Sequence, residues 1–228
     1  MTAIAKQELE TVGKNYDRDK MFKVRGMTRD AIRAIAAAVK PGMLEEDAVE
    51  MAKDILAEKK MLRGWHDVYV RFGANTTKTF GAASDPGIRL GEDDIFFIDI
   101  GPIWNNLEGD GGETFVIGSD KEKLRCANDA REIFHEVRKY WLKTGGSGRK
   151  LYEIAAAAAK QRGWVLNLDL SGHRISDFPH AAVYEGPMAE VDFCPSAQLW
   201  VLEIHIWNVD HTYGGFFEDM LLDDSYFS

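Results

Sequence analysis

Cysteine and long apolar runs are what this chain of 228 residues has least of. Its two cysteines, Cys126 and Cys194, stand far apart, which fits neither a disulfide framework nor the spacing of a zinc-binding motif. No apolar stretch approaches the length of a membrane span, and the first residues, MTAIAKQELETVGKNYD, lack the apolar core of a signal peptide. We therefore expect a reducing, cytoplasmic setting and no membrane partner.

Basic residues are also in the minority, since 28 Lys and Arg stand against 37 Asp and Glu and give a formal net charge of −9. This balance argues against a nucleic-acid-binding surface. Carboxylates gathered as metal ligands would add to the negative charge, although a solvated acidic surface explains most of it. The hydrophobic fraction of 45% is ordinary for a globular protein, and the chain is long enough for one sizeable core.

The pattern of apolar residues predicts an α+β fold. Four segments repeat apolar residues at helical spacing, and they are residues 21–38, 45–61, 121–142 and 150–162. Three runs rich in β-branched and aromatic residues predict strands, at residues 66–72, 95–100 and 113–117. The remainder up to residue 222 mixes short strand-like runs with Gly and Pro. Because no repeat, low-complexity tract or linker divides the chain, we expect a single domain over residues 1–228.

The first candidate for chemistry is Asp99 in the run FFIDIG. Alternation along the predicted strand places Phe97 and Asp99 on one face, with Ile98 and Ile100 on the other. Burying a carboxylate in so apolar a run is costly unless it is paired or binds a metal, although Asp99 could instead end the strand and cap a turn. Asp110, in NNLEGDGGETF, is by itself typical of a turn. A strand, a connection and a returning strand can nevertheless bring the two carboxylates together.

Three later residues extend this set. His173 lies in SGHRISDFPH, which also contains His180, and a histidine alone is more often a satisfied polar group than a ligand. Glu203 interrupts the apolar run WVLEIHIW, so its burial is also costly unless it is paired or binds a metal. Alternation places His205 on the same face, where it could support a ligand. Glu218, in GGFFEDMLLDD, could equally belong to a solvated acidic face.

Taken together, four carboxylates and one imidazole suit two divalent cations of intermediate hardness. Four negative charges nearly cancel two dications, which would leave a bridging water able to lose a proton near neutral pH. Without metal, converging carboxylates would repel one another and take up protons. The expected ligands are Asp99, Asp110, His173, Glu203 and Glu218.

These residues, with their order and their flanks IDIG, GDGGETF, SGH, LE and FFED, resemble the pita-bread fold of methionine aminopeptidases, prolidases and aminopeptidase P. The resemblance covers roughly residues 21–222. It implies an antiparallel sheet covered by helices. It also implies two divalent metal ions, with Mn²⁺ as the favoured metal and Co²⁺, Fe²⁺ or Zn²⁺ as alternatives. The N-terminal creatinase-type domain of prolidases and aminopeptidase P is expected to be absent.

The resemblance also implies how the ligands are divided between the two ions. Asp99 would hold one ion, and His173 and Glu203 would hold the other. Asp110 and Glu218 would bridge the two.

Catalytic and substrate-binding roles follow from the same resemblance. His180, at the place of the family's second histidine, would hydrogen-bond the scissile carbonyl or the tetrahedral intermediate, and Glu203 would take a proton from the attacking water. The family's substrate-contacting histidine is missing from the stretch before Asp99. His66 is the nearest replacement, although an exposed residue at the start of a strand is the more natural interpretation. Arg174, where relatives tend to have Gly, would either clamp a substrate carboxylate or face solvent.

The implied function is hydrolysis of an amide bond near a peptide N-terminus, as by an aminopeptidase or an X-Pro peptidase, through a metal-bound hydroxide. Two alternatives stay open. One is hydrolysis of a small non-peptide C–N bond, which creatinase performs on this fold without the metal ligands, and the other is a binding module that has lost catalysis. The intact ligand set favours an enzyme. The expected partner is a peptide or small amide rather than a nucleic acid, and a homodimer is favoured over a monomer.

Overall fold

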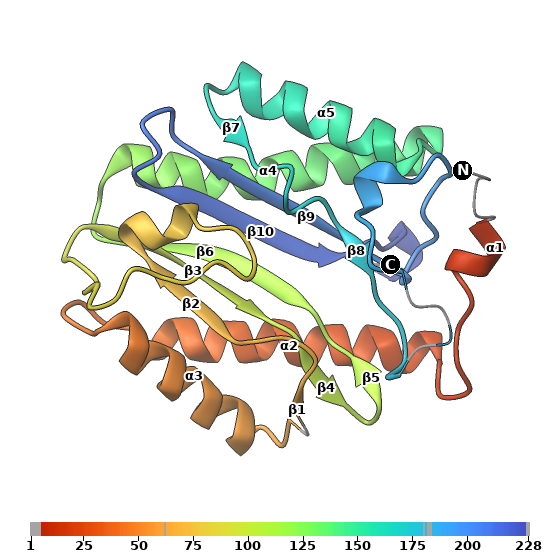
Figure 1. Ribbon diagram of the computed structural model, residues 1–228, viewed down its shortest axis with the longest axis horizontal. Coiled ribbons are helices and arrows are strands. Elements are labelled where there is room, and N and C mark those ends of the chain that lie inside the picture. The colour runs from red at the N-terminus through yellow and green to blue at the C-terminus, as the bar shows by residue number, and fades with distance from the viewer. Residues whose placement is uncertain (1–5, 62, 180, 182–183, 227–228) are drawn as a thin grey trace.

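The computed structural model describes residues 6–61, 63–179, 181 and 184–226. A sheet of seven strands runs through the molecule (Figure 1). Its strands are β2 Tyr69–Phe72, β3 Asp94–Ile100, β6 Gly111–Ile117, β7 Val165–Leu166, β8 His173–Arg174, β9 Trp200–Trp207 and β10 Gly214–Met220. They lie in the order β2-β3-β6-β10-β9-β7, with β8 also paired to β9, and these pairings are antiparallel.

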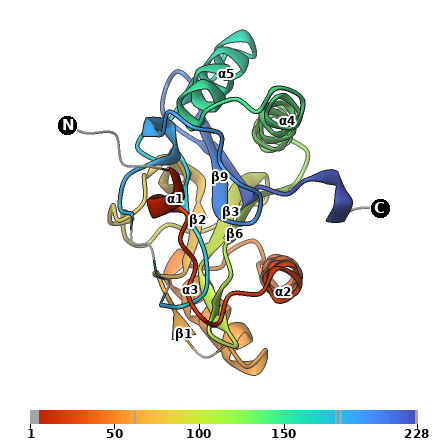
Figure 2. The ribbon, with the colours of Figure 1, turned by 90° about the vertical axis from the view of Figure 1, so that its right-hand side faces the viewer.

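Four long helices of the described chain flank this sheet, and they are α2 Arg18–Ala38, α3 Glu45–Glu58, α4 Lys121–Thr144 and α5 Gly148–Gln161. Figure 1 shows α2 and α3 along one half of the sheet and α4 and α5 along the other. Turned by 90°, the molecule has α2 and α4 on the same side of the sheet (Figure 2). The prediction of an antiparallel sheet covered by helices is confirmed.

The remaining elements are short. A second sheet pairs β4 Pro102–Trp104 with β1 Arg63–Gly64 on one side and β5 Leu107–Glu108 on the other. The short helices are α1 Lys6–Leu9 and the 3₁₀ segments η1 Gly73–Thr77, η2 Met188–Glu190 and η3 Asp224–Tyr226. None of the helices in the described part of the chain is both long and apolar enough to cross a membrane.

Local signals in the sequence explain where the long helices begin and end. The side chain of Asp17 caps α2 by accepting from the backbone N–H of Lys20, and Asp120 caps α4 in the same way. Gly145 ends α4 with a left-handed conformation (φ 65°), which glycine adopts without steric cost. Ser147 then caps α5. The connection between these helices therefore needs only three residues after α4.

Two hydrophobic clusters hold the helices against the sheet. One joins α4 and α5 to β9 and β10, and it includes Ile133 and Leu202. The other joins α2 and α3 to β2 and β3, and it includes Ile32 and Ile98. Phe97 instead packs with aromatic and aliphatic residues on the opposite face of β3. The predicted alternation along β3 is therefore confirmed.

The predicted strand at residues 66–72 is shorter than expected, because β2 begins at Tyr69. His66 precedes the strand and lies in the segment that joins β1 to β2. The difference matters for the site, since a residue outside a strand is free of strand alternation.

Candidate metal centre

Three of the predicted carboxylate ligands lie in one row across the sheet. Asp99 of β3 is opposite Gly112 of β6, which is opposite Glu218 of β10, and Glu218 is opposite Glu203 of β9. Side chains of directly opposite residues lie on the same face of a sheet. Strand register therefore brings together carboxylates that are far apart in the sequence.

Glycine at position 112 leaves open the space between these carboxylates. A Cβ on Gly112 would lie 2.3 Å from Cε1 of Phe216 and 3.1 Å from Oε1 of Glu218. Gly101, two residues after Asp99, likewise leaves space for a side chain, because a Cβ there would lie 2.3 Å from Nε2 of His66. Both glycines thus keep side-chain atoms out of the region toward which the donor groups point.

Asp110 and His173 approach the row from neighbouring segments. Asp110 follows β5 and is 2% exposed. Nε2 of His173 lies 2.9 Å from Oδ2 of Asp110, and Nδ1–H of His173 donates to the carbonyl oxygen of Arg174 at 2.8 Å. Oδ2 of Asp110 is thus paired with His173, whereas Oε1 of Glu218 has no hydrogen bond among the described residues. A buried carboxylate oxygen without a hydrogen bond is what a site built for cations would contain.

Glu203 is held in place at both its side chain and its backbone. Its Oε2 accepts the backbone N–H of Gly172 at 2.8 Å. The hydroxyl of Tyr152 donates to the Glu203 carbonyl at 3.0 Å and accepts from its N–H at 3.1 Å. One carboxylate oxygen of Glu203 is thus committed to the backbone, and the residue sits at a fixed point of β9.

Burial and crowding shift the pKa of the carboxyl groups. Burial raises the pKa of Asp99 to about 7 and that of Glu218 well above its ordinary value, and neighbouring carboxylates add to both shifts. Burial likewise raises the pKa of Glu203. Burial acts to raise the pKa of Asp110 too, but His173 and His66 outweigh it and lower that pKa. The other three acids hold protons more readily when no cation offsets their charge.

The pKa values of the two imidazoles are raised as well, and here the cause is the neighbouring carboxylates. Burial acts to lower the pKa of His66, but Asp99 and Asp110 outweigh it and raise the pKa to about 9. Burial acts to lower the pKa of His173 as well, and Asp110 and Glu203 raise it to about 10. The protonated rings thus bring positive charge to a cluster of carboxylates that would otherwise repel one another.

The donor atoms form two groups that share Asp110. One group is His66, Asp99 and Asp110, and the other is Asp110, His173 and Glu218; within each group the donor atoms lie within 4.8 Å of one another. Carboxylate oxygen and imidazole nitrogen are suitable ligands for divalent first-row metals. The residues present therefore fit metal ions. Glu203 belongs to neither group, but all five predicted ligands line the same cavity, described below.

Two expectations about histidines need comment. His66 is not an exposed residue at the start of a strand, as its sequence context suggested, because its side chain is only 6% exposed and contacts the carboxylates of the site. His180 lies outside the described residues. Local patterns did not indicate the burial of His66, since it depends on the segment before β2 folding back over Gly101.

The solvent-facing interpretation of Arg174 is wrong, and the carboxylate clamp gains no support. In the two-residue strand β8, His173 points to the site and the next side chain points to the opposite face. The guanidinium of Arg174 is buried, donates to the carbonyl oxygens of Leu199 and Ile175, and lies 5.7 Å from the ring of Trp200. It therefore helps to hold the fold and does not line the cavity described below.

His205 lies on the same face of β9 as Glu203, as alternation predicted. Its Nε2 is 2.7 Å from the carbonyl oxygen of Thr76, and its Nδ1 is 3.1 Å from Nδ2 of Asn167. Both ring nitrogens are thus engaged away from the carboxylates. His205 belongs to neither donor group.

A cavity of about 670 Å³ opens onto the carboxylates. Its apolar wall consists of Trp65, Phe80, Leu168, Leu170 and Pro187, and its exposed rim carries Asp169, Glu185 and Glu190. None of the described residues that line it is Lys or Arg. Sequence reasoning missed these wall and rim residues, because they come from loops without a motif.

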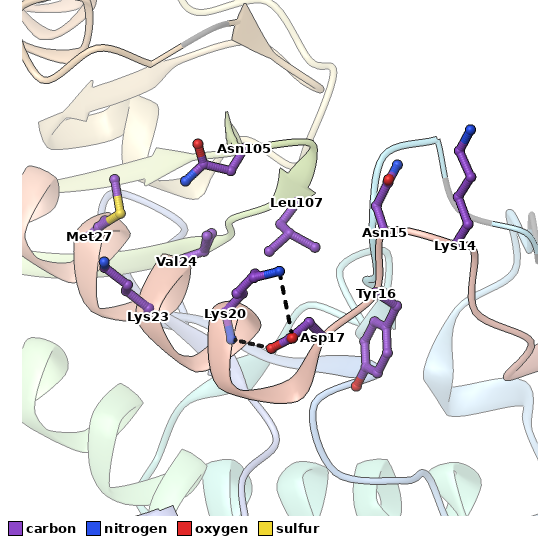
Figure 3. A pocket seen from close by; sticks show the side chains of 10 residues that line it. All are labelled: Lys14, Asn15, Tyr16, Asp17, Lys20, Lys23, Val24, Met27, Asn105 and Leu107. Carbon is purple, nitrogen blue, oxygen red and sulfur yellow. Dashed lines mark hydrogen bonds and ion pairs between the residues drawn. The ribbon is translucent and has the colours of Figure 1, made fainter.

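A second cavity, of about 510 Å³, lies beside the start of α2 (Figure 3). Its lining includes Lys14, Lys20 and Lys23, and its one carboxylate, Asp17, caps α2 and pairs with Lys20 at 3.6 Å. With a single, engaged carboxylate, this cavity offers no set of ligands for divalent ions.

Comparison with known proteins identifies relatives of this chain. Residues 19–222 match the model of metallopeptidase family M24. The methionine aminopeptidase of Helicobacter pylori is 25% identical over 167 residues, which are 69% of this chain and 64% of that protein. The Xaa-Pro dipeptidase of Pyrococcus furiosus is 26% identical over 137 residues, which are 59% of this chain and 38% of that protein. The chain thus spans less than two thirds of either relative.

Solved structures show the same fold. The prolidase from Pyrococcus horikoshii has a TM-score of 0.73 and 19% identity, with 95% of this chain and 61% of that chain covered. The methionine aminopeptidase from Thermotoga maritima has a TM-score of 0.68 and 16% identity, with 98% and 96% covered. The predicted pita-bread fold is confirmed, and the match over residues 19–222 shows that the chain belongs to metallopeptidase family M24.

Proposed function

We propose that this chain is a hydrolase with two divalent metal ions, with Mn²⁺ as the favoured metal. It cleaves the amide bond near the amino end of a peptide. The observation that carries the proposal is the convergence of four buried carboxylates and an imidazole beside one cavity. When bound, the two ions would polarise the scissile carbonyl and make water acidic near neutral pH. The carboxylates alone could do neither.

The ligand roles are those that the family resemblance implies. Asp99 would hold one ion, while His173 and Glu203 would hold the other. Asp110 and Glu218 would bridge the pair, and the buried Oε1 of Glu218, which has no hydrogen bond among the described residues, supports this part of the proposal. The membership of Asp110 in both donor groups supports it further.

Glu203 is also our candidate for the group that takes a proton from the attacking water. Because Oε2 accepts from Gly172, the other carboxylate oxygen is the one left for proton transfer. The bonds from Tyr152 fix the backbone from which this carboxylate projects. His180 would hydrogen-bond the scissile carbonyl, as the family resemblance implies.

The charge of the cavity favours an aminopeptidase over a dipeptidase. Its described lining has an acidic rim, formed by Asp169, Glu185 and Glu190, and no Lys or Arg. Such a rim attracts a protonated amino group and repels a free carboxylate close to the scissile bond. The apolar wall around Trp65 and Phe80 would pack against an uncharged part of the substrate.

The test starts from protein stripped of metal by a chelator and reloaded with Mn²⁺ or Co²⁺. Elemental analysis should give two ions per chain, and tripeptide amides should be hydrolysed faster than dipeptides with a free carboxylate. Asp110→Asn should lose metal and activity. Glu50→Gln is the matched control, because it removes one carboxylate from the exposed face of α3.

Other outcomes would separate the alternatives. Hydrolysis of non-peptide amides alone would assign the small-substrate function. A folded chain that takes up no metal, or that hydrolyses nothing when loaded, would overturn the proposal in favour of a binding module. A cytoplasmic location, a homodimer and a single domain over residues 1–228 stay predictions.

A further inference from the structure

His66 has the surroundings of a metal ligand. It lies between β1 and β2 with its side chain 6% exposed. Its Nε2 lies 3.6 Å from Oδ1 of Asp99 and 3.4 Å from Oδ1 of Asp110. One nitrogen and two carboxylate oxygens thus converge, and the donor atoms of these three residues lie within 4.8 Å of one another.

The orientation of the ring is fixed from its other side. Nδ1–H of His66 donates to the carbonyl oxygen of Asp67 at 2.6 Å, and a carbonyl oxygen can only accept. This bond leaves Nε2 of the neutral ring as the atom with a free lone pair, directed at the two carboxylates. Metal-bound histidines commonly donate their second N–H to a carbonyl or carboxylate in this way.

Packing also holds the ring in position. Trp65 meets it edge-on with ring centroids 4.4 Å apart, and Phe80 does so at 5.5 Å. Tyr69 stacks on it at 6.5 Å. The absent side chain of Gly101 supplies the space for Nε2. A ring fixed in this way loses little freedom when it binds an ion.

His173 provides an internal comparison. Its Nδ1–H donates to the carbonyl oxygen of the next residue, Arg174, as that of His66 donates to Asp67. Its Nε2 approaches Oδ2 of Asp110, while Nε2 of His66 approaches Oδ1. The carboxylate of Asp110 therefore lies between two imidazoles, each oriented by a hydrogen bond from Nδ1–H to the carbonyl oxygen of the next residue.

We propose that His66 is a metal ligand that binds, through Nε2, the ion held by Asp99 and Asp110. The inference rests on the proposed two-metal centre and gives each ion one imidazole, where the family resemblance supplies only that of His173. An imidazole in place of an oxygen ligand shifts the preference of a site from Mn²⁺ toward Co²⁺, Fe²⁺ and Zn²⁺. The ion bound by His66 should therefore show this shift.

Titration of the metal-free protein with Co²⁺ tests the proposal. Visible absorption follows each Co²⁺ as it binds, and proton NMR detects the strongly shifted Nδ1–H of an imidazole bound to Co²⁺. Loaded wild type should show two such resonances. His66→Gln should keep one, and the affinity for one of the two ions should fall more than the about 10–100-fold that loss of an outer partner costs. His135→Gln, on an exposed position of α4, is the matched control.

Each alternative result has one meaning. If His66→Gln binds two Co²⁺ with wild-type affinities, the ligand role is overturned while the two-metal centre stands. If the wild type takes up no Co²⁺, both proposals fail. The resonance count in the wild type needs no variant, so a single shifted N–H at full loading refutes the role of His66 even if His66→Gln does not fold.

Discussion

Replacement of Gly112 by alanine tests the geometry of the row of carboxylates. The new Cβ would lie 2.3 Å from Cε1 of Phe216 and 2.6 Å from its Cδ1. Phe216 is 1% exposed and packs against Phe97 and His205, so its ring has little room to move. Overpacking of this kind costs about 1–3 kcal/mol. Each kcal/mol lowers the Tm of a chain this long by about 2–4 °C, so metal-free Gly112→Ala should melt about 2–12 °C below wild type.

The same substitution should weaken metal binding. The Cβ would lie 3.1 Å from Oε1 of Glu218, so this carboxylate would be displaced from its place opposite Glu203. Disturbance of a ligand's surroundings typically costs about 10–100-fold in metal affinity. At saturating metal that loss removes about 1.4–2.7 kcal/mol of the stabilisation by metal. Calorimetric titration with Mn²⁺ measures the first effect, and melting curves with and without Mn²⁺ measure the second.

Gly111→Ala is the matched control, because alternation directs its Cβ to the other face of β6. There the Cβ would lie 3.1 Å from Cδ1 of Ile32 and 3.3 Å from Cγ2 of Thr28. This variant should lose some stability and keep the metal affinity of wild type. If Gly112→Ala binds Mn²⁺ as wild type does, or if both variants weaken binding equally, the assigned geometry is refuted.

Three further predictions concern metal dependence, pH and the fold. Asp110→Ala removes the carboxylate that both donor groups share, so added Mn²⁺ should no longer raise the melting temperature of this variant. An equal rise in wild type and variant would contradict the assignment of Asp110. Burial raises the pKa of Cys126 from 9.0 to about 12, so the unfolded chain loses this proton first as pH rises and the folded state loses stability above about pH 9. Between pH 8 and 10 the free energy of unfolding should therefore fall by about 1.4 kcal/mol more in wild type than in Cys126→Ala. Denaturant titrations at each pH measure it, and an equal fall in both proteins would contradict the prediction. Arg174→Met loses the hydrogen bonds to the carbonyls of Leu199 and Ile175, which should lower the free energy of unfolding by about 1–3 kcal/mol. The preference between dipeptides and longer peptides should stay unchanged. A rise in KM for dipeptides alone would instead support the carboxylate clamp.

Helices and strands with strong local patterns could be predicted from the sequence alone. The helix expected at residues 21–38 is α2, which begins three residues earlier because its capping residue is Asp17. The helix expected at residues 121–142 is α4, which begins as expected and runs on to Thr144 because Gly145 ends it. Alternation also placed Asp99 correctly, since Ile98 and Phe97 pack into different clusters. These features depend on neighbours in the sequence, which a single chain displays.

Features that depend on contacts between distant segments were harder to predict. His66 belongs to no periodic element, and its burial needs the space above Gly101. The burial of Arg174 needs the carbonyl of Leu199, which approaches only once β8 has paired with β9. The convergence of Glu203 with Glu218 requires the register of β9 and β10, and the family resemblance, not the local pattern, predicted it.

The row of carboxylates ties metal binding to the pairing of strands during folding. Glu218 and Glu203 face each other only in the register that pairs Gly214 with Trp207 and Met220 with Val201. A slip of β10 by one residue would turn Glu218 to the helix-covered face and put either Phe217 or the shorter Asp219 in its place. Only the native register presents a complete set of ligands, so metal adds stability to that register and to none of its competitors. Protein that folds without metal should therefore exchange the amide hydrogens of β9 and β10 faster than protein that folds with metal, before any substrate is present.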